Sequence, residues 1–298
     1  MSEKKEILAV GSIAFDSIKT INGNREDILG GSATYFGVAA SLFTQVSVIG
    51  VVGSDFKNNH WNIFKEKNIN TDSVDIINGK TFSWGGQYNR DYSERKTLFT
   101  ELGVFENFKP NIKNKYNNPI LYLGNIQPDL QFDVINKVDN PYLLAADSMN
   151  LWIDLFPEKV WDLISKVNIL LLNDEEAMQL TEETDLYKIA DKFLSLGPEI
   201  VIIKKGSQGS LLAYENNYYE ISVVPETKLI DPTGAGDSFA GGVLGYMAIH
   251  GMKNPVKAVL YGTAIASYTV SSFGLDNLIN ISESNLYQKI TQITYNQK

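Results

Sequence analysis

Short apolar runs alternate along the chain with longer segments whose apolar residues recur at helical spacing. The runs end in glycine, serine or other polar residues, as is typical of parallel strands buried on both faces. We predict such strands at residues 6–11, 45–52, 120–123, 142–146, 167–172 and 200–204. We predict helices at residues 32–43, 55–67, 151–165, 185–196, 234–250, 255–272 and 282–294. Repetition of strand then helix indicates an α/β fold, with a mostly parallel central sheet covered by helices on both faces.

Two stretches depart from this alternation. Residues 13–28 are polar and contain Asn22-Gly23-Asn24, which is typical of a hairpin turn, and residues 81–105 alternate aromatic and polar side chains. We interpret both as antiparallel strands of a small separate sheet; an edge hairpin of the main sheet is the alternative. A separate sheet would cover the strand ends where parallel sheets bind ligands, and would act as a lid. We expect one domain over residues 1–298, with lid segments at about 13–28 and 81–105.

The composition excludes several classes of function. The 298 residues include 26 Lys and Arg against 35 Asp and Glu, a net charge of −9, which argues against nucleic acid or an anionic membrane as the main partner. The chain has no cysteine, which excludes disulfides, thiol nucleophiles and cysteine-bound metals. Its two histidines, His60 and His250, each stand alone, so no histidine-rich metal site is expected. No apolar run is long enough for a signal-peptide core or a membrane helix, so we expect a cytoplasmic location.

The strongest chemical motif opens the predicted helix 234–250 and reads DPTGAGDSFAGG from Asp231, after a β-rich stretch at 221–224. The small residues Gly234, Ala235 and Gly236 let a ligand approach the backbone, and N–H groups at a helix N-terminus attract anions. Asp237 follows in the first turn, where its carboxylate can accept a proton from a substrate hydroxyl. A base beside anion-binding amides is what phosphoryl transfer to an alcohol requires. The alternative is tight packing by the glycines and a carboxylate that interacts with the helix dipole.

Two further motifs follow predicted strands. Asn173 and Glu176 come directly after the strand 167–172, where an amide and a carboxylate can hold a hydrated Mg²⁺ and a phosphate oxygen. The same spacing fits a helix capping box. Lys204 precedes a glycine-rich turn from Gly206 to Gly209, which suits nucleotide phosphates or the face of a base. That turn also fits a hairpin that joins residues 200–204 to 210–214.

Polar residues near the first strand form a fourth candidate. Asp16 follows that strand, and Gly30-Gly31 open the first helix. The paired glycines permit a polar ligand to approach the backbone closely. Asp16 as an ordinary turn residue is the alternative.

Five segments, in their order along the chain, together resemble the ribokinase-like family of carbohydrate kinases, also called the PfkB family. They read GGSATYFGVAASLF, VVGSDF, NDEE, KKGSQG and DPTGAGDSFAGG. The resemblance extends from Ile7 to Gly274. It implies a three-layer ribokinase-like domain with a small β-sheet lid. It also implies transfer of the γ-phosphoryl group of MgATP to a hydroxymethyl group of a sugar.

The resemblance assigns roles to individual residues. Asp237 is implied as the catalytic base, residues 234–236 as the anion hole, and Glu176 with Asn173 as the Mg²⁺ and phosphate motif, with Glu176 acting through water. The residues expected to bind the nucleotide are Asn173, Glu176, Lys204, Gly206, Gly209, Thr233 and Thr263. The residues expected to bind the acceptor are Asp16, Gly30, Gly31, Ser32, Tyr35 and Asn125. Asp231 stands where some members hold a monovalent cation such as K⁺, and some members dimerise through the lid, so a homodimer is expected.

Three departures from the family pattern bear on the acceptor. Tyr35 stands where the family usually has Asn, and Thr263 where an Asn often lies near the adenine. The segment from Asp147 to Trp152 is one residue longer than the family's D-x-N segment and lacks its usual Arg. These departures leave the base and the anion hole in place. The lid stretches also carry Arg25, Arg90 and Arg95, so a phosphorylated sugar stays open as the acceptor.

Other interpretations of the function remain open beside that of a sugar kinase. The nearest is a nucleoside kinase of the same family, because the acceptor region is rich in aromatic residues that can stack on a base: Phe15, Tyr35, Phe36, Phe82, Trp84 and Tyr88. A non-catalytic module that binds nucleotides or sugars is the second alternative. The chain has no GxxxxGK[ST] motif, which excludes a P-loop kinase, and residues 234–236 lack the third glycine of a dehydrogenase fingerprint. Ser238 misses the hydrolase elbow by one residue, and only His250 follows it.

Overall fold

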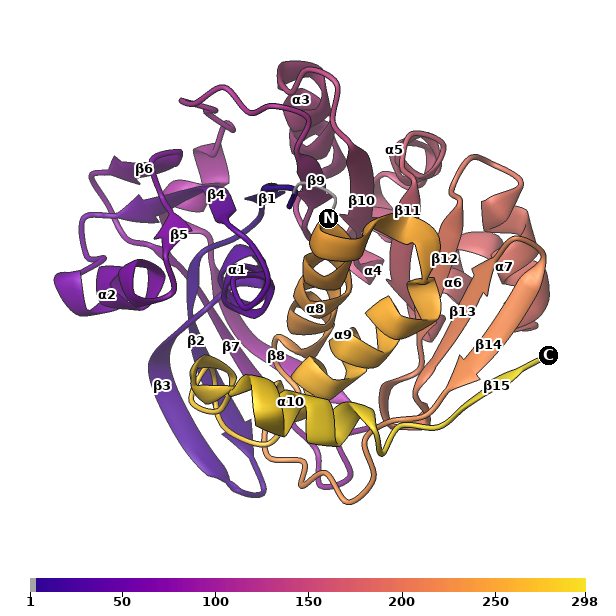
Figure 1. Cartoon of the computed structure of the whole chain (residues 1–298). Helices are drawn as coiled ribbons and strands as arrows, with labels where there is room; N and C mark the ends of the chain where they lie inside the picture. Colours follow the sequence, from indigo (N-terminus) through magenta and orange to yellow (C-terminus); the bar gives the residue numbers. More distant parts are fainter. Residues whose placement is uncertain (1–3) are drawn as a thin grey trace.

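A computed structural model describes residues 4–298 and shows a large sheet between two layers of helices, with a smaller sheet against one end (Figure 1). The order of strands in the large sheet is β15-β14-β13-β12-β11-β10-β9-β1-β4-β5, and β6 pairs with β4. All pairs from β5 to β12 are parallel, and those from β12 to β15 are antiparallel. The bounds are β1 (Ile7–Val10), β4 (Val46–Gly53), β5 (Ile69–Asn70), β6 (Val74–Ile77), β9 (Ile120–Leu123), β10 (Leu143–Asp147), β11 (Ile169–Asn173), β12 (Ile200–Lys204), β13 (Ser210–Tyr214), β14 (Asn217–Ile221) and β15 (Tyr295–Gln297).

Two apolar layers hold the helices to the sheet. Along β1, Ile7 and Ala9 face one layer while Leu8 and Val10 face the other, because successive side chains of a strand point to opposite faces. Helices α1 (Ser32–Ala40), α8 (Ala235–His250), α9 (Pro255–Thr269) and α10 (Glu283–Ile290) cover the first face. Helices α3 (Pro128–Lys137), α5 (Pro157–Ile164), α6 (Asp174–Thr181) and α7 (Leu186–Leu194) cover the second. Two more, α2 (Asn58–Glu66) and α4 (Asn150–Leu155), lie at the margins. The predicted three-layer α/β architecture is confirmed.

The lid segments form a separate four-stranded sheet, which confirms the prediction and excludes the edge hairpin. Its order is β3-β2-β7-β8, with bounds β2 (Ala14–Thr20), β3 (Gly23–Gly30), β7 (Phe82–Tyr88) and β8 (Arg95–Glu101). Each hairpin is antiparallel, but the central strands β2 and β7 are parallel. The expectation of antiparallel strands is therefore wrong at this one pairing. Both strands leave the same edge of the main sheet, so they run in one direction.

Several boundaries differ from the predictions for local reasons. The predicted helix 151–165 is split into α4 and α5 at Phe156, because the following Pro157 disfavours helical geometry at the residue before it. The strand expected at 221–224 lies instead at β14, whose tyrosine-rich residues pair with β13. The predictions also missed α3, α6, β5, β6 and β15.

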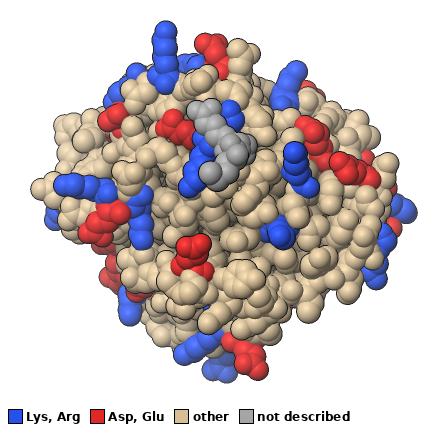
Figure 2. All heavy atoms as spheres, in the orientation of Figure 1, with Lys and Arg blue, Asp and Glu red and all other residues tan. Residues whose placement is uncertain are grey.

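The surface mixes both charges. Lys and Arg side chains lie among Asp and Glu side chains over the face in Figure 2, and no large area of one sign is visible there. Within residues 4–298, none of the helices has the length and apolar character needed to cross a membrane.

Candidate active site

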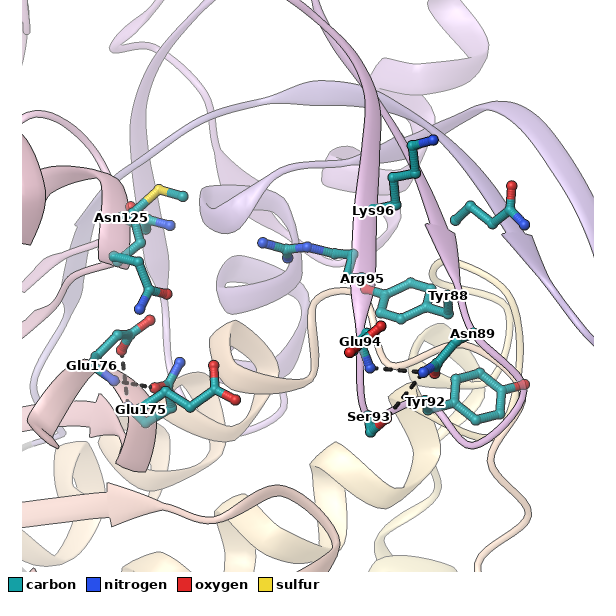
Figure 3. Close-up of a pocket in the computed structure, with 14 residues that line it drawn as sticks. Tyr88, Asn89, Tyr92, Ser93, Glu94, Arg95, Lys96, Asn125, Glu175 and Glu176 are labelled. Carbon is teal, nitrogen blue, oxygen red and sulfur yellow. Dashed lines mark hydrogen bonds between the residues drawn. The ribbon is translucent and has the colours of Figure 1, made fainter. Parts of the chain in front are cut away.

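The carboxyl ends of β9, β10 and β11 face the lid across a cavity of about 850 Å³ (Figure 3). Tyr88 and Arg95 line it from the lid. Asn125, Asn173 and Glu176 line it from the side of the main sheet. This is the edge at which parallel α/β sheets bind ligands, and the volume lies within the range of small-molecule sites.

The first turn of α8 is open at its N-terminus. Gly234 is the N-cap in left-handed geometry, with φ 73°, and no side chain caps the helix. The Ala235 N–H donates to the Pro232 carbonyl at 3.2 Å, whereas the amides of Gly234 and Gly236 find no acceptor within residues 4–298. Of the three amides predicted to form the anion hole, that of Ala235 is thus already bonded within the turn. Two amides remain for an anion.

Asp237 lies in that first turn and has a strongly perturbed carboxyl group. Burial raises the pKa of Asp237 to about 7, the charge of Asp147 adds to the rise, and the positive charge of Lys204 opposes it. A carboxylate with a pKa near neutrality is a better proton acceptor than an ordinary aspartate. The structure therefore places a buried carboxyl group with a raised pKa beside the free amides.

The Asp16 side chain packs against Gly30. Asp16 lies inside β2 and not in a turn, so the turn alternative is wrong. A Cβ at Gly30 would lie 1.9 Å from Asp16 Oδ2, so only glycine leaves room for this carboxylate. Burial raises the pKa of Asp16 to about 7, the charges of Asp231 and Asp237 add to the rise, and a hydrogen bond from the Gly31 backbone lowers it. A second buried carboxyl group with a raised pKa thus lies near Asp237.

Gly31 and Ser32 hold the start of α1 close to Ser12, which follows β1. Gly31 has φ 92°, and a Cβ on it would lie 2.5 Å from the Ser12 carbonyl oxygen. The Ser12 N–H donates to Ser32 Oγ at 3.0 Å. These contacts join the start of α1 to the end of β1, and a contact between Ser32 and an acceptor stays a prediction.

Tyr35 is buried in α1 behind the α8 N-terminus. Its hydroxyl group has no hydrogen-bond partner within residues 4–298. Burial raises the pKa of Tyr35 well above its usual value, and the charges of Asp16 and Asp231 reinforce this, so the phenol is neutral. A neutral hydroxyl group is thus buried near the acidic residues, and a contact between Tyr35 and an acceptor stays a prediction.

Asn173 and Glu176 form the capping box that was the alternative reading. The Glu176 N–H donates to Asn173 Oδ1 at 2.7 Å, and the Asn173 N–H donates to Glu176 Oε2 at 2.9 Å. Glu176 Oε1 is left over. Burial raises the pKa of Glu176 to about 7, Asp147 adds to the rise, and Lys204 opposes it.

The side chains present fit a hydrated Mg²⁺ better than a bare one. Within residues 4–298, no three acidic or histidine side chains come close enough to hold a metal ion directly. Mg²⁺ usually keeps several waters and takes one or two carboxylates together with substrate phosphates. Glu176 Oε1, which accepts no hydrogen bond from residues 4–298, suits that arrangement.

The glycine-rich turn after β12 is a hairpin, as the alternative reading had it. β12 and β13 are antiparallel, and a Cβ at Gly209 would lie 2.0 Å from the Ile221 carbonyl oxygen. Gly206 also has left-handed geometry, φ 54°, but nothing lies within 4 Å of its Cβ position. Gly209 is thus required by the hairpin, and Gly206 faces open space that a ligand can occupy.

Of the predicted site residues, Asn125, Asn173 and Glu176 line the cavity itself, whereas Asp16, Lys204 and Asp237 are not among its lining residues. Asp231 is fully buried, and its two oxygens accept hydrogen bonds from the Thr233 N–H at 2.9 Å and the Gly274 N–H at 3.3 Å. The Thr233 hydroxyl lies 3.0 Å from the Tyr88 hydroxyl, a link to the lid. Asn125 Oδ1 accepts from the Trp152 indole at 2.9 Å. Thr263 is nearly buried in α9 and does not line this cavity.

Two charged residues of the site were not assigned to it from the sequence. Arg95 reaches from β8 into the cavity on the side of Asn125 and Glu176 (Figure 3). Asp147 ends β10 and forms an ion pair with Lys204 at 2.7 Å. The register of β8 on β7 decides which way Arg95 points, and the strand order decides which lysine meets Asp147. Neither follows from local sequence.

Comparison with known proteins agrees with this geometry. A family model described as pfkB family carbohydrate kinase matches residues 5–281. The chain is 24% identical over 246 residues to a cytidine kinase of Thermococcus kodakarensis, which covers 80% of this chain and 87% of that one. It is 25% identical over 284 residues to a nucleoside kinase of Methanocaldococcus jannaschii, covering 91% of this chain and 92% of that one.

Solved structures share the whole fold. The crystal structure of the Methanocaldococcus jannaschii nucleoside kinase matches with a TM-score of 0.79 at 22% identity, covering 96% of this chain and 98% of that chain. A fructokinase of Vibrio cholerae, solved with fructose, ADP and calcium, matches with a TM-score of 0.78 at 16% identity, covering 96% and 99%. At these identities the likeness shows the fold alone.

Proposed function

Since the chain belongs to the pfkB family of carbohydrate kinases, we propose that it transfers the γ-phosphoryl group of MgATP to the hydroxymethyl group of a nucleoside. The chain is a phosphotransferase with an alcohol acceptor and has the ribokinase-like fold. The observation that carries the proposed chemistry is the position of Asp237, an activated carboxyl group beside two free amides at the start of α8.

The proposed reaction assigns one task to each group. Asp237 takes the proton of the acceptor hydroxyl group as the oxygen–phosphorus bond forms. The bond from the γ-phosphorus to its bridging oxygen breaks, and ADP leaves. The amides of Gly234 and Gly236 bind the equatorial oxygens of the phosphoryl group. Asp16 binds hydroxyl groups of the acceptor under the lid.

Glu176 would hold Mg²⁺ through water, and the ion would neutralise charge on the nucleotide phosphates. Arg95 would bring a positive charge from the lid to the same region. Asp231 is the candidate ligand for a monovalent cation such as K⁺, through lone pairs that its two backbone hydrogen bonds leave. A comparison of turnover in K⁺ and Na⁺ tests this last role.

Two observations favour a nucleoside over a free sugar. The cytidine and nucleoside kinases match most of this chain, whereas the fructokinases of Salmonella match 31% of it. The cavity also carries Tyr88 and Tyr92, whose rings lie 6.0 Å apart on the lid and offer faces for a base. A sugar is the second candidate, favoured by the structural match to a fructokinase solved with fructose.

An acceptor panel with MgATP tests the proposal. Cytidine, adenosine, inosine, guanosine, ribose and fructose are compared by ADP release, and the product is identified by phosphorus NMR. The proposal is supported if a nucleoside has the highest kcat/KM. If a sugar has the highest value, the acceptor is a sugar and not a nucleoside. Nucleotide binding without turnover of any acceptor would indicate a non-catalytic binding module.

The lid is also our proposed homodimer contact. Leu98 and Phe99 lie on the edge strand β8 and are 51% and 38% exposed. An unpaired edge strand with exposed apolar side chains favours association. Light scattering of the purified chain and of Leu98→Glu tests it: a dimer that the substitution dissociates supports the contact, and a wild-type monomer contradicts it.

A further inference from the structure

A buried lysine–aspartate pair lies directly beside the proposed anion hole. Lys204 Nζ is 2.7 Å from Asp147 Oδ2, and their side chains are 17% and 6% exposed. Removing two charges from water is costly, and such a pair adds little to stability compared with apolar residues of similar size. The charges of the pair act on Glu176, which lines the cavity, so its presence calls for a reason other than stability.

The strand order explains how the two residues meet. Asp147 is the last residue of β10 and Lys204 the last of β12, with β11 between them. Asp147 Oδ1 accepts from the Ser148 N–H at 2.9 Å, which fixes the carboxylate while Oδ2 binds the lysine. The pair thus spans the end of β11 in a defined orientation.

Lys204 Nζ also lies against the start of α8. A Cβ at Gly236 would be 3.3 Å from Nζ, so the ammonium group lies beside the backbone of a residue whose amide is free. An ammonium group has three donors, and Asp147 is the one partner found for it within residues 4–298. Nζ and the Gly236 amide can therefore donate to one anion.

We propose that Lys204 is a catalytic residue that donates from Nζ to the transferring phosphoryl group, and that Asp147 is the positioning residue that holds it there. This role rests on the proposed function and deepens it. Lys204 keeps its protons throughout, since the acceptor proton goes to Asp237. Its charge stabilises the negative charge on the phosphoryl oxygens while one oxygen–phosphorus bond forms and the other breaks.

A purely structural role is the competing explanation: Lys204 would only neutralise Asp147. The double variant Asp147→Asn/Lys204→Met separates the two explanations, because it removes both charges together. If Lys204 only neutralises Asp147, the double variant regains turnover that Lys204→Met alone has lost. If Lys204 acts on the phosphoryl group, the double variant stays as slow as Lys204→Met.

The expected kinetic result is a loss in kcat with little change in substrate binding. Lys204→Met should lower kcat about 10²–10³-fold, as the loss of one donor to a developing charge does elsewhere. Lys204→Arg keeps the charge and should recover part of this loss. Asp147→Asn should lower kcat less than Lys204→Met, because the ammonium group remains but is less well held. Melting temperatures of all variants show whether each one folds.

The pH profile gives a second readout. The charged and titratable groups that face Asp237 come from five elements: Asp147, Lys204, Asp16, Tyr35 and Tyr122. Removing the positive charge of Lys204 raises the pKa of Asp237, so the acid limb of kcat/KM should move to higher pH. Removing the negative charge of Asp147 should move it to lower pH.

Calorimetry with a transition-state mimic needs no turnover. Wild type and Lys204→Met are titrated with MgADP alone and with MgADP, aluminium fluoride and the acceptor together. We expect similar affinities for MgADP alone and at least about tenfold weaker binding of the mimic by Lys204→Met, equivalent to the loss of one charge-assisted contact. Equal affinity for the mimic, or wild-type kcat in the double variant, would overturn the role of Lys204. Wild-type protein that phosphorylates no acceptor would instead refute the proposed function.

Discussion

The ring of Tyr35 lies against the backbone of Gly234, so closely that a Cβ on Gly234 would be 2.3 Å from the ring's Cγ. Gly234 also has left-handed geometry, which side chains other than that of glycine rarely adopt. Helix α1 and the start of α8 are thus fitted to one another. The free amides of the proposed anion hole lie at this contact.

Gly234→Ala should therefore destabilise the protein and slow turnover together. The left-handed backbone alone costs about 1–2 kcal/mol for alanine, and the ring contact adds to it. Chemical denaturation measures the change. Gly206→Ala is the matched control, because Gly206 has φ 54° but nothing lies within 4 Å of its Cβ position. Equal losses in the two variants would show that the contact with Tyr35 contributes nothing.

Tyr35→Phe should leave the unliganded protein as stable as wild type or more stable. The substitution removes a buried hydroxyl group that has no hydrogen-bond partner among residues 4–298, and such a group costs free energy when unpaired. If the hydroxyl group bonds to the acceptor, KM for the acceptor should rise about 5–10-fold, which corresponds to one hydrogen bond.

Tyr116→Phe controls for this prediction. Its hydroxyl group is also buried without a partner, but Tyr116 packs against the opposite apolar layer. It should gain stability without any change in KM. An unchanged acceptor KM in Tyr35→Phe would remove Tyr35 from the acceptor site.

The sequence was sufficient to predict the layers and the second small sheet, and it singled out Asp237 as the candidate base. Strong apolar runs located the main strands, and the glycine-rich start of α8 identified Asp237. Pairings between distant segments were harder. Asp147 and Lys204 lie 57 residues apart and meet only because β10 and β12 flank β11. A local pattern does not encode strand order, so that contact required the structure.

Short motifs also left two interpretations open. Asn173 and Glu176 were interpreted either as ligands or as a capping box, and the structure shows the capping box with one carboxylate oxygen left over. Gly209 is required by its hairpin, while Gly206 is not constrained by a neighbour. The sequence pattern is the same for a residue that shapes the backbone and for one that binds a ligand, so the pattern alone did not separate the two.

The stability of the unliganded protein should fall as pH rises from about 4 to about 7. Burial raises the pKa values of Asp16 and Asp237 in the folded state to about 7, from the usual value of 3.8. Between these values the folded state binds more protons than the unfolded state, so raising the pH favours unfolding. Asp237→Asn removes one such group and should stabilise the protein more at pH 8 than at pH 4. Thermal unfolding across this range measures it, and an equal gain at both values would contradict the raised pKa.

Glu176→Gln should raise the Mg²⁺ concentration needed for half-maximal turnover about 10–100-fold, as loss of a group that orients a metal's ligands does. The amide oxygen of glutamine can still accept from the Asn173 N–H, so the capping box survives. Burial raises the pKa of Glu176 to about 7, so removing its charge should not lower stability at neutral pH. Asp174→Asn, in the same turn of α6, controls for loss of a negative charge at the helix N-terminus. Turnover is measured against Mg²⁺ concentration. Identical curves for wild type and Glu176→Gln would show that the carboxylate only caps the helix.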